Sequence, residues 1–281
     1  MHYPPYASKL GRGGARAMKR IVLTALDYGI AFGVDRAIRT LLADSRLTAV
    51  GCLAASDRWS REYLPLREQV EDKSSRTRIG LTLAFCRPFA PVSDPARAIF
   101  GERLPGPRYY TLRRPAGLLP AAAIKAEIAA QIQCFEDYYG RRPAFVAMHD
   151  QMDRNIALAK LVVEVLVERF GENLPDFLFS EPERLRSRLL ARRIRKLGGQ
   201  TNREAVTLPL TEEASQLHRF FWRALEGRRD STTVWCAPAE PDKNLRSMTS
   251  DAEAHARQAQ FHYLNSSDFL LALTEKDIFL F

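Results

Sequence analysis

The chain has 281 residues, 46% of them hydrophobic, so it is long enough for one barrel-like domain or two smaller domains. Its formal net charge of +9 indicates anionic partners, such as phosphorylated ligands, anionic membranes or nucleic acid. No apolar run approaches the roughly 20 residues of a membrane span, and four widely spaced cysteines without a Cys-x-x-Cys pair argue against a disulfide framework or a structural zinc site.

These features predict a cytoplasmic protein with reduced, mostly buried thiols and no transmembrane segment. Residues 1–18 carry basic side chains but no apolar segment of the kind found in secretory signals, so we expect a flexible basic leader there. A single domain is expected over 19–281, and a homodimer is compatible with the sequence.

The first predicted element is a buried parallel strand, carried by the apolar run at 21–23. Asp27, Gly29 and Gly33 follow it and indicate a turn before a helix that extends to residue 45. Further strands are expected at 47–53, 79–85, 143–148, 177–179 and 232–236, and after a short helix within 268–281. Helices are expected at 58–70, 121–139, 156–170, within a basic insertion at 181–203, at 211–225 with Thr211 as its N-cap, and at 251–263.

The segment 87–120 differs in character, since seven prolines divide it. We expect a long Pro-rich loop, which either folds over a pocket or is a surface excursion.

Strands that alternate with helices predict an α/β fold with a parallel sheet. Polar residues at the ends of short strands favour a distorted TIM-like (β/α) barrel, of the glycoside hydrolase and deacetylase type, over an open sheet. The sequence has no Gly-x-Gly-x-x-Gly and no Gly-Lys-Ser/Thr, so nucleotide binding of the common kinds is not supported.

Chemistry-bearing residues follow several predicted strands. They are Asp27, Thr82, and His149 together with Asp150 and Asp153. In a parallel barrel these positions converge, and Asp and His side chains at one point could hold a divalent metal that activates water. The alternative is structural, with a buried histidine and an aspartate that caps a turn.

Arginines crowd the segment 184–196. A candidate anion patch consists of Arg184, Arg188, Arg192 and Arg195. The segment has no interleaved aromatic residues, so a solvated helix face is the simplest interpretation and a nucleic-acid site the least favoured one.

Five motifs in the correct order resemble the YdjC-like carbohydrate deacetylases, the ChbG/HpnK family. The strand that ends in Leu26-Asp27-Tyr-Gly resembles that family's Ala-Asp-Asp-Phe-Gly, and Ile79-Gly-Leu-Thr-Leu resembles Gly-Leu-His-Leu. The helix from Glu127, the stretch from Phe145 to Asp153, and Trp235-Cys-Ala-Pro-Ala resemble three later segments of the family.

The resemblance implies a distorted TIM-like barrel that removes the N-acetyl group from an N-acetylglucosamine-type sugar. In that family a divalent metal, held by one Asp and two His, polarises the acetyl carbonyl and the attacking water, and a carboxylate is the base. Asp27 and His149 match two of the expected metal ligands. If the chain retains catalytic activity, the resemblance also implies a catalytic role for Asp27.

Several matched positions depart from the family pattern. Leu26 replaces the first aspartate and Thr82 replaces a metal histidine. The later replacements are Ala147, Gln151, Asp153 and Ala237. Asp150 or Asp153 could supply a carboxylate ligand instead, and the cofactor of an active enzyme would be Mg²⁺ or Zn²⁺.

We therefore expect a catalytically impaired or repurposed member that binds a glycan. Its partner would be an N-acetylated sugar, free, phosphorylated or lipid-linked, with Tyr28 and Trp235 as candidate substrate-binding residues. The alternatives are an active atypical hydrolase, and an anion- or nucleic-acid-binding protein that uses the arginine-rich helix.

Overall fold

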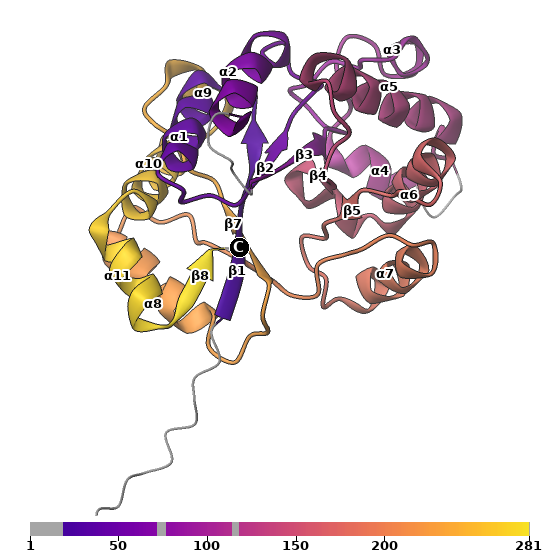
Figure 1. The fold of residues 1–281 in the computed structure, drawn as a ribbon. Helices are drawn as coiled ribbons and strands as arrows, with labels where there is room; N and C mark the ends of the chain where they lie inside the picture. The colour runs from indigo at the N-terminus through magenta and orange to yellow at the C-terminus, as the bar shows by residue number, and fades with distance from the viewer. Residues whose placement is uncertain (1–18, 72–76, 114–117, 281) are drawn as a thin grey trace, which may run out of the picture.

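A single parallel sheet forms the centre of the protein and helices surround it (Figure 1). The computed structural model of the chain describes residues 19–71, 77–113 and 118–280. The strands in this part of the chain are β1 (Lys19–Tyr28), β2 (Ala49–Cys52), β3 (Arg78–Leu83), β4 (Phe145–Met148), β5 (Asp176–Phe177), β6 (Ala205–Thr207), β7 (Thr232–Cys236) and β8 (Ile278–Leu280).

The strand order is β5-β4-β3-β2-β1-β7-β6, and every pairing is parallel. The long strand β1 pairs with two strands along the same edge. β8 pairs with Lys19–Ile21, and β2 pairs from Thr24 onward. The segment before β6 reaches back to β5, where Phe177 N donates to the Gln200 carbonyl at 2.9 Å. The curled sheet confirms the predicted distorted TIM-like barrel.

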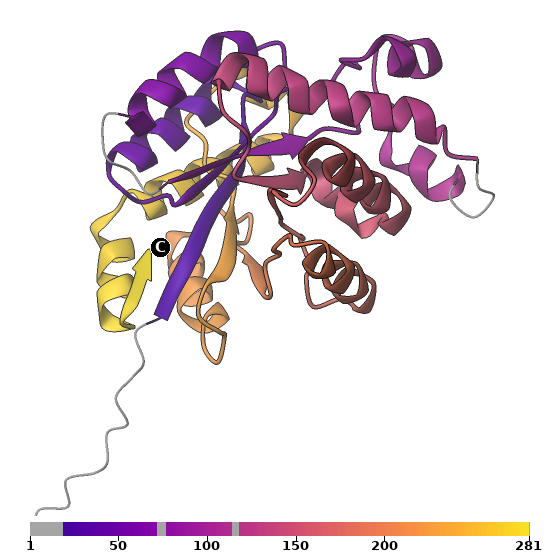
Figure 2. The same ribbon diagram turned by 45° about the vertical axis from the view of Figure 1, so that its right-hand side comes forward.

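The helices fill the connections between strands and pack outside the sheet (Figure 2). They are α1 (Phe32–Ala43), α2 (Trp59–Glu71), α3 (Asp94–Phe100), α4 (Pro107–Arg113), α5 (Ala121–Tyr139), η1 (His149–Arg154), α6 (Ile156–Phe170), α7 (Leu185–Lys196), α8 (Ala214–Ala224), α9 (Lys243–Met248), α10 (Asp251–Leu264) and α11 (Ser267–Glu275).

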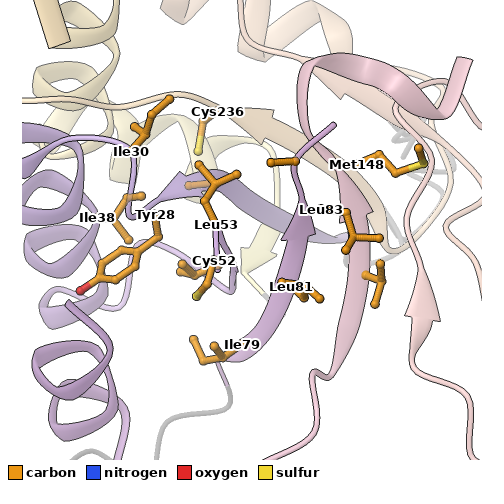
Figure 3. Close-up of a cluster of buried hydrophobic side chains, with 14 of the residues drawn as sticks. Tyr28, Ile30, Ile38, Cys52, Leu53, Ile79, Leu81, Leu83, Met148 and Cys236 are labelled. Carbon is orange, nitrogen blue, oxygen red and sulfur yellow. The ribbon is translucent and has the colours of Figure 1, made fainter. Parts of the chain in front are cut away.

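Two apolar layers follow from the alternation of side chains along the strands. The inner layer fills the barrel and contains Ala49, Phe145, Ala147, Leu178 and Trp235. The outer layer lies between strands and helices, and Figure 3 shows part of it, with Tyr28 beside Ile38, and Cys52 between these two and Leu81. Burial of both faces explains why the central strands read as continuous apolar runs.

The barrel interior is narrow around β2 and β3. A Cβ at Gly51 would lie 2.2 Å from Thr82 Oγ1 and 2.7 Å from a methyl group of Leu26. A Cβ at Gly80 would lie 2.5 Å from the Phe145 carbonyl oxygen. Glycine at these positions therefore lets large side chains on the neighbouring strands cross the interior.

The segment 87–120 differs from the expected loop, because α3 and α4 lie within it; residues 114–117 are outside the described part. Ser93 caps α3, where its side chain accepts from Ala96 N at 3.3 Å.

The start of α8 also differs from the expectation. Thr211 is not its N-cap, because α8 begins three residues later, and Thr211 accepts from Glu213 N at 3.3 Å before the helix. The short helix α9 was not anticipated, although Asp242 caps it by accepting from Asn244 N at 2.9 Å.

The four cysteines are free thiols, as expected, and three of them are buried. Within the described ranges, no helix combines the length and the apolar character that crossing a bilayer requires.

Candidate functional site

A cavity of about 180 Å³ opens at the carboxyl ends of β1, β4, β6 and β7. The pairing register of β1 with β2 shifts between Ala25 and Tyr28, and consecutive residues Leu26 and Asp27 both line the cavity. Such an irregularity re-aims side chains at the end of a strand. The apolar part of the lining also includes Leu178, Leu208 and Trp235.

Asp27 lies between two cationic side chains. Its Oδ2 accepts from Arg257 Nη1 at 2.7 Å, and its Oδ1 is 3.5 Å from His149 Nε2. The other ring nitrogen of His149 is 3.2 Å from Asp150 Oδ2, and Arg257 Nε donates to Glu253 Oε1 at 3.1 Å. Each cation is thus shared between two carboxylates.

The charges of this cluster stabilise one another. Burial alone would raise the pKa of Asp27, but Arg257 and His149 outweigh it and hold that pKa well below its ordinary value. Burial opposes protonation of His149, but Asp150 and Asp27 raise its pKa to about 9. The pKa of Arg257 also rises, because Asp27 and Glu253 outweigh its burial. At neutral pH Asp27 is a carboxylate and His149 an imidazolium.

His149 is held at the start of an unusual turn. It follows β4, and the next two residues, Asp150 and Gln151, have φ of 51° and 55° although neither is glycine. Left-handed backbone at such residues is uncommon and often occurs at functional positions. The Phe89 ring packs nearly perpendicular to the imidazole, with centroids 5.5 Å apart, and this contact helps to orient the histidine.

The turn after Asp27 is held in place by a buried carboxylate of α1. Gly29 has φ of 97°, and its N–H donates to the buried carboxylate of Asp35 at 2.5 Å. Asp35 also accepts from Arg58 Nε at 3.2 Å. Burial raises the pKa of Asp35 to about 7, so its charge depends on these two donors.

Asp27 and His149 are the two predicted ligands that meet in the cavity. Thr82 is fully buried near Gly51 and Leu26 in the barrel interior, and its hydroxyl has no hydrogen-bond partner within the described ranges. Asp150 lies beside His149 and is half exposed.

The remaining predicted site residues have different positions. Asp153 is turned toward Ser180, where its Oδ2 accepts from the backbone N–H at 3.0 Å and the hydroxyl at 2.9 Å. Tyr28 is buried behind the sheet and donates to the Glu62 carbonyl at 2.8 Å. Trp235 lines the cavity, and its buried indole nitrogen has no partner in the part of the chain described.

These side chains do not fit the metal that the family resemblance implies. Among the described residues, no group of three or more His, Cys, Asp and Glu is arranged to hold a metal ion. Thr82 supplies a hydroxyl where an imidazole is needed, and catalytic zinc sites use three protein ligands. The guanidinium of Arg257 also already pairs with the carboxylate that a metal would use.

Arg257 and Gln260 also line the candidate site, and the sequence did not indicate them. Gln260 connects the loops around the cavity, since it accepts from Ala237 N at 2.8 Å and donates to the Pro209 carbonyl at 2.9 Å. The buried face of α10 includes Ala254, Phe261 and Leu264, and the two polar residues share that face. A single arginine on a buried helix face is a signal that could have identified Arg257.

Three of the four arginines of the predicted anion patch line a second cavity. Arg188, Arg192 and Arg195 are in its walls, whereas Arg184 forms an ion pair with Glu181. This cavity lies beside the amino-terminal ends of β6 and β7, away from Asp27.

The fold and the site define an α/β-barrel protein whose pocket, at the carboxyl ends of the parallel strands, combines a charged cluster with apolar walls. The chain belongs to the family of YdjC-like proteins, whose family model matches residues 20–275. A solved structure from Enterococcus faecalis V583, provisionally assigned as a cellobiose-phosphate cleavage protein, is similar with a TM-score of 0.71. It is 16% identical, and the match covers 94% of this chain and 97% of that one. No curated protein matches the chain.

Proposed function

We propose that this chain is a glycan-binding member of the YdjC-like family that has lost metal-dependent deacetylation. The carrying observation is the 2.7 Å contact between Arg257 Nη1 and Asp27 Oδ2. A fixed cation of the protein occupies one side of the carboxylate, and Thr82 replaces a ligand. Metal-assisted hydrolysis needs a Lewis acid, a base and an acid for the leaving amine. Asp27 is a weak base because its pKa is lowered. His149 is protonated and can donate a proton, but the described residues of the site include no strong base to activate a water molecule.

The proposed ligand is an N-acetylated sugar. The cavity of about 180 Å³ is smaller than the ~300–1,000 Å³ of most small-molecule pockets, which favours about one sugar unit. The Trp235 side chain lines the cavity and offers apolar aromatic surface to a sugar ring. Phosphate or lipid attached to the sugar would extend outside this cavity. The cytoplasmic location and the homodimer stay predictions from the sequence.

The decisive experiment measures binding and turnover on one protein preparation. N-acetylglucosamine and its short oligomers are titrated by calorimetry, and acetate release is assayed with added Zn²⁺ or Mg²⁺ and with chelator. We expect saturable sugar binding, no stoichiometric metal binding and no metal-dependent acetate release. Acetate release that requires metal and disappears in both Asp27→Ala and His149→Ala would support the active atypical hydrolase instead.

A matched pair of variants tests the role of the indole. Trp235→Ala removes the aromatic surface from the cavity wall, so sugar affinity should fall about tenfold. Trp222→Ala is the control, because Trp222 lies outside this cavity. Equal affinities for the two variants would contradict the assignment of Trp235.

A further inference from the structure

A second cavity, of about 460 Å³, lies on the flank of the barrel. Its walls contain five arginines: Arg188, Arg192, Arg195, Arg203 and Arg229. The cavity adjoins the amino-terminal ends of β6 and β7, since Arg203 and Arg229 precede these strands, whereas the Asp27 cavity lies at the opposite ends of the same strands. It is therefore separate from the proposed sugar site.

Three segments of the chain build this cavity. Arg188, Arg192 and Arg195 are spaced i, i+4 and i+7 on α7, so they share one face of that helix. Arg203 comes from the connection before β6 and Arg229 from the connection before β7. The tertiary structure, and not only the sequence of α7, brings the guanidinium groups together around one concavity.

The positive charge in the cavity is only partly neutralised. Glu183 and Glu204 also line it; Glu183 pairs with Arg228, outside the cavity lining, at 3.1 Å, and Glu204 pairs with Arg229, whose Nε is 3.4 Å from its Oε1. Arg195 donates to the hydroxyl of Thr201 at 3.0 Å. Within the described ranges, the remaining arginines of the cavity have no hydrogen bond or ion pair to a carboxylate; they are Arg188, Arg192 and Arg203.

The helix also carries this charge without internal compensation. α7 has no acidic residue, and Arg188, Arg192 and Lys196 follow one another at i, i+4 spacing. Like charges at that spacing destabilise a helix. An anion in the cavity would relieve this repulsion and occupy the unpaired guanidinium groups.

We propose that this cavity binds a ligand that carries two linked phosphate groups. Arginine is suited to phosphate because its planar fork donates two parallel hydrogen bonds, and several arginines from different directions can surround a diphosphate. The volume lies in the range of small-molecule pockets. A nucleic-acid strand is the less favoured occupant, since Arg186 and Arg193 are not among the residues that line the cavity and its described lining contains no aromatic side chain on which bases could stack.

The test is a titration of the full chain with inorganic pyrophosphate and, in parallel, with a nucleoside diphosphate. Both probes should bind saturably with one site per chain, and inorganic phosphate should bind more weakly. Arg188→Gln/Arg192→Gln should weaken the binding of pyrophosphate about tenfold or more. Tighter binding of the nucleoside diphosphate than of pyrophosphate would assign an organic diphosphate ester as the source.

The matched control is Arg186→Gln/Arg193→Gln, which removes the same charge from the opposite face of the same helix. It should bind pyrophosphate like the unaltered protein. Equal weakening in the two double variants would overturn the proposal, because it would show a general charge effect. So would the absence of saturable binding, or a single-stranded oligonucleotide that binds more tightly as its length grows. Thermal melting of both variants confirms that they fold.

Discussion

The two cavities differ in whether their cationic side chains are paired with carboxylates. At the carboxyl ends of the strands, Arg257 and His149 are each shared between two carboxylates. On the flank near the amino-terminal ends, four arginines of one cavity have no carboxylate partner in the described part of the chain: Arg188, Arg192, Arg195 and Arg203. The first cavity neutralises its charges within the protein, whereas most of the arginines of the second do not pair with a carboxylate.

The proposed function accounts for this difference. A buried carboxylate without a cation is costly, so a site that does not bind a metal needs another positive group to neutralise its carboxylate. Arg257 meets that need from a helix 230 residues away in sequence. Most arginines of the flank cavity are exposed, and an exposed cation does not need an internal partner to the same extent as a buried one.

Removal of Arg257 is expected to have the largest effect. Arg257→Ala would leave the buried carboxylate of Asp27 without its main counterion, which typically costs about 3–5 kcal/mol of the free energy of unfolding. The measurement is urea denaturation at pH 7. Arg193→Ala, on an exposed helix face, is the control and should change stability by less than about 0.5 kcal/mol.

A double variant sharpens this prediction. Asp27→Asn/Arg257→Ala removes both charges, so it should lose less stability than the sum of the two single variants. Additive losses would mean that the two side chains do not stabilise each other, and the view of Arg257 as the neutralising cation would then be wrong.

The barrel could be predicted from the sequence because its strands are buried on both faces. The apolar run at 21–23 and the short strands at 79–85 and 143–148 all correspond to strands of the sheet. The helices α3 and α4 were not anticipated, because prolines that suggested a loop stand in or next to their first turns, where proline is tolerated. A short strand was expected at 177–179 and β5 lies at Asp176–Phe177, whereas the three-residue strand β6 was not assigned, because so short a strand depends on its neighbours and not on a local pattern.

The site could be predicted only in part. Asp27 and His149 were identified because they follow strands and match family motifs, and these two side chains do meet. Thr82 faces the barrel interior and Tyr28 the helices, since the direction of a side chain at a strand end depends on local register shifts. Arg257 was missed because helix periodicity says which face is buried, but not which distant group a buried arginine contacts.

The second largest expected effect is the change in the free energy of unfolding with pH. The folded state raises the pKa of His149 from 6.5 to about 9, which corresponds to roughly 3 kcal/mol. A raised pKa means that the folded state binds the proton more tightly. This stability is therefore fully present below about pH 6.5 and is lost as the pH rises through about 9.

Unfolding experiments between pH 6 and 10 check this. His149→Gln should remove most of the decline in stability, whereas His262→Gln, at an exposed position on α10, should keep it. An unchanged pH profile in His149→Gln would mean that the imidazole is not held between Asp27 and Asp150 as a cation.

The smallest expected effect compares two arginines of α7 and its N-cap, one without a carboxylate partner and one in an ion pair. Arg192 has an arginine four residues before it and a lysine four residues after it, so Arg192→Gln should stabilise the protein by about 0.5 kcal/mol at low salt. Arg184→Gln removes an ion pair with Glu181 and should instead lower stability slightly. Added salt should shrink both differences, because it screens exposed charges. Thermal melting at two ionic strengths measures them, and a loss of stability in Arg192→Gln would mean that the cavity arginines are already neutralised within the protein.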